Sequence, residues 1–270
     1  MTVPFKARLR EARYALPGVL ERHIAGETAE QAARSCARLA RSGVAVTPGY
    51  FHGGEAEPAA VADTWRRLAT SLAQAGCDAL LALKAPALGF DGELVRSIAE
   101  AGVPLVFDSL TEPLAARTLE LAELSSAGAA LPARWRRSAG DAARLRDGSS
   151  RIRLIKGEWA DPAGDPRDFA EAYLELAGIL ARRRATVGVA THDPVLAEAT
   201  LNMLLDAGTP CELEQLRGLP RRRTMAVARK LGVRVRLYYP FGPGWWPYAL
   251  DKALARPYLP LWALRDLIGA

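Results

Sequence analysis

The chain has 270 residues, of which half are hydrophobic and 24% are charged, and its net charge is +6. This composition excludes a disordered chain and provides enough apolar surface for one large folded domain. The arginines are spread among Ala and Leu in helical stretches, without the aromatic-interleaved basic stripe of single-strand binders, so no nucleic-acid partner is predicted.

The sequence has an odd number of cysteines, and they lack the spacing of metal ligands: Cys36, Cys77 and Cys211. Neither a disulfide framework nor a metal site is therefore predicted. No apolar run reaches the ~20 residues needed to cross a bilayer, and the charged start of the chain lacks the core of a signal peptide. We expect a cytoplasmic protein without an integral membrane segment, and a peripheral contact with a membrane stays compatible with this.

Residues 1–42 carry helical patterns and precede the first β-type run. We predict that they form an N-terminal helical segment that either caps the bottom of the following domain or packs outside it. Residues 43–270 contain no linker or low-complexity stretch, which predicts one domain for the remainder.

Eight short apolar runs of β type follow, separated by longer helical stretches rich in Ala, Leu and Arg. This alternation predicts parallel βαβ units. Eight repeats in a chain of this length favour a closed (βα)8 TIM-type barrel of the α/β class over an open doubly wound sheet. The predicted strands are Val44–Phe51, Asp78–Ala85, Val103–Ser109, Gly128–Ala133, Arg151–Glu158, Thr186–Asp193, Pro210–Gly218 and Arg234–Gly242.

Two helical stretches, Pro58–Ala75 and Pro166–Arg184, carry apolar residues at three- and four-residue spacing. Each opens on a proline, which is favoured in the first turn of a helix. Glycines precede or begin several strands, where a left-handed helix cap is expected. They are Gly43, Gly76, Gly102, Gly128 and Gly232.

Polar side chains gather at the ends of the predicted strands, where barrels of this kind place their active sites. Such groups are unfavourable in a core unless they are paired, so they predict a site at the barrel mouth. They are Lys84, Asp108, Arg153, Lys156, Glu158, His192, Glu212, Glu214, Gln215, Arg217 and Tyr238, with Tyr248 beyond the last strand.

Structural roles compete with functional ones for several of these residues. Lys84 and Asp108 fit a structural ion pair as well as a direct role. His192 fits a hydrogen-bonded core histidine, because one histidine alone does not predict a metal. The aromatic run at 245–248 fits either a packed loop or a lid over a flat ligand. A nucleophile elbow and a Rossmann glycine fingerprint are both missing.

Four motifs resemble those of the proline dehydrogenase family. RLIKGEW at 153–159 resembles R-L-V-K-G-A-Y, and ATHD at 190–193 resembles A-T-H-N/D. ELEQLRG at 212–218 is similar to E-F-Q-x-L-x-G, and YYPFG with WWPY at 238–248 is similar to Y-x-P-Y-G and W-Y-P-Y. The resemblance runs from about residue 43 to 257.

The resemblance implies a distorted (βα)8 barrel that holds FAD without a covalent bond. It implies oxidation of a small secondary amine or imino acid to an imine, by hydride transfer to flavin N5. Family members pass electrons to membrane quinones, and this sequence shows no quinone site, so the electron acceptor stays open.

By position in the motifs, Lys84, Asp108, Arg153, Tyr238 and Tyr248 would serve catalysis. The cofactor would be held by Arg153, Ile155, Lys156, Gly157, Trp159, His192 and Glu214. The substrate would contact Leu216, Arg217, Tyr248, Asp251 and Lys252. A cation such as Arg153 beside flavin N5 and O4 would stabilise the anionic reduced flavin.

Departures from the family pattern concern the substrate first. Asp251 and Lys252 stand where the family carries an arginine pair that clamps the proline carboxylate. Breaking such a buried charge pair typically costs ~3–5 kcal/mol, so a substrate other than ordinary L-proline is predicted. Arg217 is a candidate for a relocated carboxylate partner, and Asp251 for a partner of a cationic group on a different amine.

Other departures concern the cofactor. Pro132 and Glu214 stand where the family has flavin-contacting glutamines, and a one-residue bulge would bring Gln215 to the second place. Asp165 and Pro166 align with residues that hold the adenine side of FAD. The alternatives to a flavin dehydrogenase are therefore a barrel enzyme that has lost flavin and catalyses another reaction, and a non-catalytic binding homologue.

Overall fold

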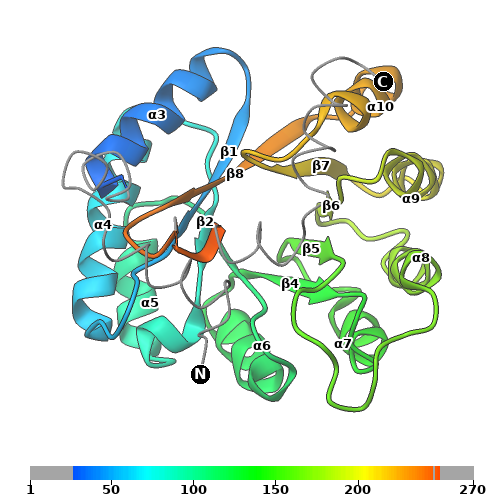
Figure 1. The fold of residues 1–270 in the computed structure, drawn as a ribbon, viewed down its shortest axis with the longest axis horizontal. Helices are drawn as coiled ribbons and strands as arrows, with labels where there is room; N and C mark the ends of the chain where they lie inside the picture. The colour runs from blue at the N-terminus through cyan, green and yellow to red at the C-terminus, as the bar shows by residue number, and fades with distance from the viewer. Residues whose placement is uncertain (1–26, 246, 250–270) are drawn as a thin grey trace, which may run out of the picture.

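The computed structural model describes residues 27–245 and 247–249, which form a closed barrel of parallel strands in the order β1 to β8 (Figure 1). This confirms the predicted (βα)8 TIM-type fold, and each strand lies inside a predicted run. The strands are β1 Ala45–Tyr50, β2 Leu81–Leu83, β3 Leu105–Phe107, β4 Gly128–Pro132, β5 Ile152–Ile155, β6 Val187–Ala190, β7 Cys211–Leu216 and β8 Val235–Phe241.

Helices surround the barrel as an outer ring (Figure 1). They are α3 Ala29–Arg41, α4 Pro58–Gln74, α5 Gly92–Ala99, α6 Ala115–Leu124, α7 Ser138–Leu145, α8 Phe169–Ile179, α9 Pro194–Asp206 and α10 Arg222–Leu231. Short 3-10 helices, η1 Ala85–Leu88 and η2 Glu112–Leu114, follow β2 and β3. Across the described ranges, every helix is too short or too polar to cross a membrane.

The prediction that a helix opens at Pro166 is wrong, whereas Pro58 does occupy the first turn of α4. Helix α8 begins at Phe169, because the carboxylate of Asp168 accepts hydrogen bonds from the backbone N–H groups of Ala170 and Glu171. An aspartate that satisfies these first N–H groups sets the start of a helix more strongly than a proline upstream.

Four of the five glycines named from the sequence have φ between +60° and +79°, as predicted for left-handed caps: Gly43, Gly76, Gly102 and Gly232. Gly128 does not, since Ser126 takes the left-handed conformation in that turn with φ +53°. Gly128 is needed for space, because a Cβ there would lie 2.6 Å from the carbonyl oxygen of Arg151 on the neighbouring segment.

The main apolar core lies between the barrel and its helices. Alternate strand residues point outward and pack against helix residues, as the two-residue period of a strand requires. The core includes Leu81, Leu83, Phe107, Leu131, Leu154, Val189 and Leu213 from the strands, and Trp65, Leu68, Leu72, Tyr173, Leu176 and Leu201 from the helices. The inward side holds a much smaller apolar cluster of Leu80, Ala82 and Val106, against which Tyr238 packs.

Alternating charges occupy much of the remaining barrel interior. Inward positions of β5, β7 and β8 carry arginine or glutamate, and neighbouring members form ion pairs. We call this series the lumen charge chain. It runs Arg234, Asp78, Arg236, Glu212, Arg151, Glu214, Arg153, Asp108, Lys84, from the start of the strands to the mouth.

Helix α3 covers the outside of the seam between β1 and β8, and it packs on α4. The hydroxyl of Tyr239 in β8 donates to Glu27, just before α3, at 2.6 Å. In a regular barrel a helix that follows the last strand covers this place. Of the two arrangements predicted for the N-terminal segment, the described part packs outside the barrel; residues 1–26 lie outside the described residues.

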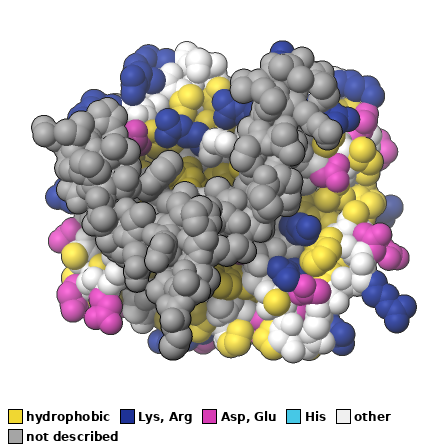
Figure 2. Space-filling view, in the orientation of Figure 1, with side chains coloured by type: hydrophobic (Ala, Val, Ile, Leu, Met, Phe, Trp, Pro, Cys, Tyr) yellow, Lys and Arg dark blue, Asp and Glu magenta, His cyan; other side chains and the backbone are white. Residues whose placement is uncertain are grey.

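Where Figure 2 shows described residues, mostly around the rim of this face, Lys and Arg side chains are interspersed with Asp and Glu. This distribution agrees with arginines placed on solvated helix surfaces, as the sequence indicates.

We predict that Gly128→Ala destabilises the protein by about 1–3 kcal/mol, because its Cβ has no space beside Arg151. Gly140→Ala in α7 is the control, since nothing lies within 4 Å of that Cβ, and it should add about 0.5–1 kcal/mol by removing a helical glycine. Urea unfolding measures both. Equal stability of the two variants would contradict the steric argument.

Candidate active site

A cavity of about 320 Å³ opens at the mouth of the barrel, where the sequence predicts the site. Apolar side chains make most of its wall: Phe51, Leu110, Ala130, Ile155, Trp159, Ala190, Leu216, Leu219 and Trp245. Its polar lining consists of Lys84, Asp108, Ser109, Arg153, Glu158, His192, Glu214, Gln215, Tyr238 and Tyr248. Such a concave, largely apolar site with a few converging polar groups suits a small organic ligand.

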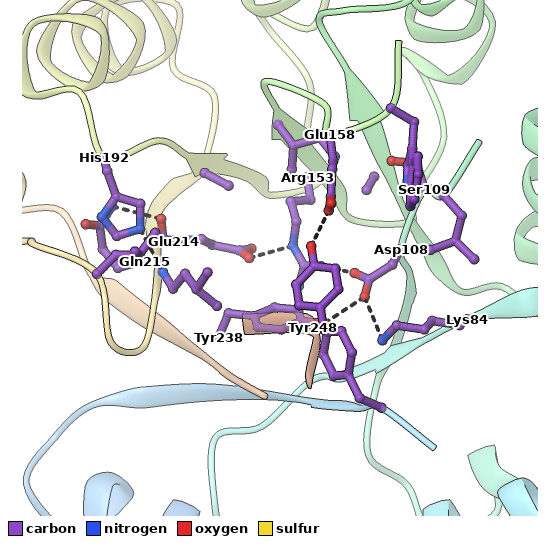
Figure 3. A pocket seen from close by; sticks show the side chains of 18 of the residues that line it. Lys84, Asp108, Ser109, Arg153, Glu158, His192, Glu214, Gln215, Tyr238 and Tyr248 are labelled. Atoms are coloured by element: carbon purple, nitrogen blue, oxygen red, sulfur yellow. Dashed lines mark hydrogen bonds and ion pairs between the residues drawn. The ribbon is translucent and has the colours of Figure 1, made fainter. Parts of the chain in front are cut away.

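Arg153 lies at the base of this cavity, between two carboxylates (Figure 3). Its Nε donates to Glu214 Oε2 at 2.6 Å, and its Nη1 donates to Asp108 Oδ1 at 2.8 Å. Arg153 is only 3% exposed, yet its Nη2 has no hydrogen-bond partner among the described residues. Because an unpaired buried donor is unfavourable, this N–H indicates an acceptor supplied by a ligand.

Asp108 joins two further groups of the mouth. Its Oδ2 accepts a hydrogen bond from the Tyr238 hydroxyl at 2.7 Å and lies 3.5 Å from Lys84 Nζ. Lys84 Nζ also donates to the Tyr50 carbonyl at 3.0 Å and lies 4.0 Å from the centre of the Phe51 ring. The predicted Lys84–Asp108 pair is therefore present, and it belongs to a larger network.

Burial shifts the pKa values of this network. Burial lowers the pKa of the Lys84 ammonium more than the attraction of Asp108 raises it. Burial, assisted by the Asp108 carboxylate, raises the pKa of the Tyr238 hydroxyl well above its usual value. Tyr238 consequently stays protonated and serves as a donor to Asp108.

Glu214 stands on β7 with both carboxylate oxygens occupied. Oε2 accepts from Arg153, and Oε1 accepts from Arg151 Nη2 at 2.7 Å. Gly188 on β6 leaves room for it, since a Cβ there would collide with the Glu214 carboxylate. Burial raises the pKa of Glu214, but the charges of Arg153 and Arg151 outweigh it and lower the pKa from 4.5 to about 2.

The bulge that would bring Gln215 into the place of Glu214 is absent. The pairing of β7 with β8 continues without interruption from Leu213 to Leu216. The Gln215 amide instead donates to the Thr191 carbonyl at 2.6 Å and accepts from the Thr224 hydroxyl on α10 at 2.7 Å. Its head group is thus bound on the helix side of the sheet.

His192 uses both ring nitrogens within the protein. The backbone N–H of Leu216 donates to Nε2 at 3.0 Å, which requires that Nδ1 carries the proton. Nδ1 then donates to the Pro220 carbonyl at 2.8 Å. The neutral ring links the segment after β6 to the last residue of β7 and to Pro220 beyond it, as a hydrogen-bonded structural histidine would. It also lines the cavity, and contact with a cofactor stays a prediction.

The end of β5 and the segment after it carry four predicted cofactor residues besides Arg153, and only some of them line the cavity. Ile155 and Trp159 line the cavity. Gly157 has φ +94°, and a Cβ there would lie 2.8 Å from the Pro132 side chain. Lys156 is not among the cavity residues, because its side chain is exposed and its Nζ lies 4.5 Å from the centre of the Phe169 ring.

The prediction that Arg217 reaches the substrate is not supported by its position. Its side chain is exposed, and its guanidinium lies 4.3 Å from the centre of the Tyr239 ring, on the outer side of β8. Leu216 and Tyr248 do line the cavity. Asp251 and Lys252 lie outside the described residues.

Tyr248 belongs to an aromatic wall of the cavity. Its ring centre lies 5.1 Å from that of Phe51 and 5.7 Å from that of Trp245. Its hydroxyl donates to Glu158, at the place where the resembling motif has alanine (Figure 3). Trp245 and Tyr248 therefore pack together with Phe51 and also line the cavity, and their role as a lid over a flat ligand stays a prediction.

Arg134 is a residue that the sequence analysis missed. Its Nη1 donates to the Glu158 carbonyl, and its Nε donates to Asp165, both at 2.7 Å. Arg134 therefore fixes the segment after β5 and occupies both carboxylate oxygens of Asp165. Its place just beyond the end of β4 was the available signal.

No protein-family model matches the chain. It is 26% identical to Proline dehydrogenase 1 of Bacillus subtilis (strain 168) over 92% of this chain and 90% of that protein. It is 27% identical to Proline dehydrogenase of Deinococcus radiodurans over 91% of this chain and 89% of that protein.

Two solved structures of Proline Utilization A (PutA) share the fold. A mutant from Bradyrhizobium japonicum has a TM-score of 0.65 at 18% identity, covering 88% of this chain and 32% of that one. The protein from Corynebacterium freiburgense has a TM-score of 0.66 at 16% identity, covering 99% of this chain and 35% of that one. The chain spans about a third of the length of these solved chains.

We predict that Glu214→Gln flattens the acid dependence of stability. The lowered pKa of Glu214 means that its ionised form stabilises the fold above about pH 4.5, and that this contribution is lost as the pH falls towards about 2. Urea unfolding of wild type and variant across this range measures the two slopes. Glu198→Gln, in an exposed pair with Lys230, is the control and should keep the wild-type slope. An unchanged slope in Glu214→Gln would contradict the prediction.

Proposed function

We propose that this chain, a divergent member of the proline dehydrogenase family, is an FAD-dependent dehydrogenase that oxidises a proline-like or other secondary amine to an imine. The relatives indicate an oxidoreductase acting on CH–NH donors. The observation that carries the finer proposal is the unpaired, buried Nη2 of Arg153 in a cavity at the barrel mouth.

The cavity residues fit a flavin in their chemistry. A flat aromatic ring system needs apolar walls, which Ile155, Trp159 and Leu216 supply. Its electronegative N5 and O4 edge needs a donor, which Arg153 Nη2 offers. Arg153, Ile155, Gly157, Trp159 and His192 would hold the cofactor, with Glu214 behind Arg153. When bound, FAD supplies the hydride acceptor.

The surrounding residues orient the amine and stabilise charge. Arg153 places a cation where negative charge develops during hydride transfer. Asp108, fixed by Tyr238 and Lys84, offers a rigid carboxylate beside the reacting amine. The aromatic wall of Phe51, Trp245 and Tyr248 restricts water.

Ordinary L-proline is not the substrate that we propose. Within the described lining, each of the two cations is already paired with a carboxylate: Lys84 with Asp108, and Arg153 with Asp108 and Glu214. The arginine pair of the family is replaced in sequence by Asp251 and Lys252. Both features favour an amine that needs no guanidinium clamp on a carboxylate.

We predict that the purified protein, supplemented with FAD, retains about one equivalent and shows flavin absorbance. Arg153→Ala should weaken FAD binding about tenfold or more, because a hydrogen bond to a charged group is worth about 1.5–3 kcal/mol. Arg217→Ala, which alters an exposed side chain outside the cavity, is the control. Protein that never takes up flavin would contradict the proposal. It would favour a barrel enzyme that catalyses another reaction, or a non-catalytic binding homologue.

We predict that Lys84→Met slows anaerobic reduction of the flavin by an accepted amine about a hundredfold, since the network that orients the amine is lost. Lys230→Met, at an exposed lysine paired with Glu198, should leave the rate unchanged. The panel of amines includes L-proline and pyrrolidine, and pyrrolidine should react faster. Faster reduction by L-proline would contradict the proposed substrate class.

A further inference from the structure

Glu214 places a carboxylate where the resembling family motif has glutamine. It is 2% exposed, and Arg153 Nε and Arg151 Nη2 donate to its two oxygens at 2.6 and 2.7 Å. Gly188, opposite on β6, leaves the space that this carboxylate fills. Arg153 on β5, Arg151 just before β5 and Gly188 on β6 thus form a seat for the negative charge of Glu214, which indicates a defined role for that charge.

The seat determines what Arg153 presents to the cavity. With Nε held by Glu214 and one N–H of Nη1 held by Asp108, Nη2 is the guanidinium nitrogen that has no partner among the described residues. The two carboxylates also oppose the positive charge of the guanidinium. A glutamine at 214 would leave that charge opposed by Asp108 alone.

We infer that Glu214 is a positioning residue that makes bound flavin a weaker electron acceptor by offsetting the charge of Arg153, while Arg151 limits this effect from the opposite side. The inference rests on the proposed function, because it requires FAD in the cavity. A cation beside the flavin favours its reduced, anionic form, so a neighbouring anion that offsets the cation disfavours it. A flavin that accepts electrons less readily requires a substrate amine that donates hydride readily.

Sulfite titration of the FAD-loaded protein tests this without turnover. Sulfite donates its electron pair to N5 of oxidised flavin, an S–N5 bond forms, and the negative charge passes to the ring, which bleaches the flavin absorbance. Flavin of higher electron affinity binds sulfite more tightly. The dissociation constant for sulfite therefore reports the charge around the ring, and a dye-coupled midpoint potential provides a second measurement.

Glu214→Gln should bind sulfite at least about tenfold more tightly, because one negative charge beside the guanidinium is gone. The corresponding rise in two-electron potential is about 30 mV per tenfold change. Arg151→Met should shift sulfite binding in the opposite direction, because it removes the cation behind Glu214. Glu198→Gln, with the same charge change on the surface, should match wild type.

Opposite shifts in the two variants would support the inference, because general damage to the site would weaken sulfite binding in both. Shifts of the same sign, or none, in protein that binds FAD would overturn the inference and leave the proposed function standing. Wild-type protein that binds no FAD would overturn both. Should Glu214→Gln fail to fold, Arg151→Met is compared with the charge-keeping Arg151→Lys: weaker sulfite binding in Arg151→Met with wild-type binding in Arg151→Lys would support the inference, and equal weakening in both would overturn it.

Discussion

The lumen charge chain is the constraint on which the site depends. A barrel interior usually holds branched apolar side chains, whereas here arginines and carboxylates from β5, β7, β8 and the residue before β5 form alternating ion pairs within it. Charges buried in this way are tolerated only together, because removing one partner leaves another uncompensated, at about 3–5 kcal/mol. Arg153 therefore takes its orientation from a series that begins at the other end of the barrel, and the mouth cannot be altered independently of the layers beneath it.

Most of the architecture was predictable because the outward strand residues pack against amphipathic helices, which makes the alternation of strand and helix visible in sequence. Which of two nearby residues starts a helix, and why a given glycine is required, were harder to predict. Pro166 is a plausible helix start, but the Asp168 carboxylate satisfies the first N–H groups of α8 and moves the start to Phe169. Gly128 resembled a helix-cap glycine in the sequence. It is required instead because Arg151, 23 positions later, leaves no space for a Cβ.

The rule that barrel sites lie at strand ends brought together Lys84, Asp108, Arg153 and Tyr238, and the structure joins them by direct contacts. The rule does not say which face of a strand a side chain takes near its end. A shift of one residue exchanges the faces, so the side-chain head groups of Gln215 and Arg217 are held on the outer side of the sheet, whereas the side chains of Glu214 and Leu216 face inward. Arg134 escaped prediction because its partners, Glu158 and Asp165, lie 24 and 31 positions away.

Helix α3 has a consequence for the order in which the chain assembles. It closes the seam at β8 although it precedes β1, and its junction with the last strand, from Glu27 to Tyr239, spans 212 positions. Contacts of such long range form late, since the loop entropy between the partners must first be overcome. During synthesis from the N-terminus, α3 and β1 would emerge long before β8, and their apolar surfaces would stay uncovered until β8 is made. Binding of a chaperone, or pairing with a strand edge of another molecule, would therefore compete with correct closure of the barrel most directly at this seam.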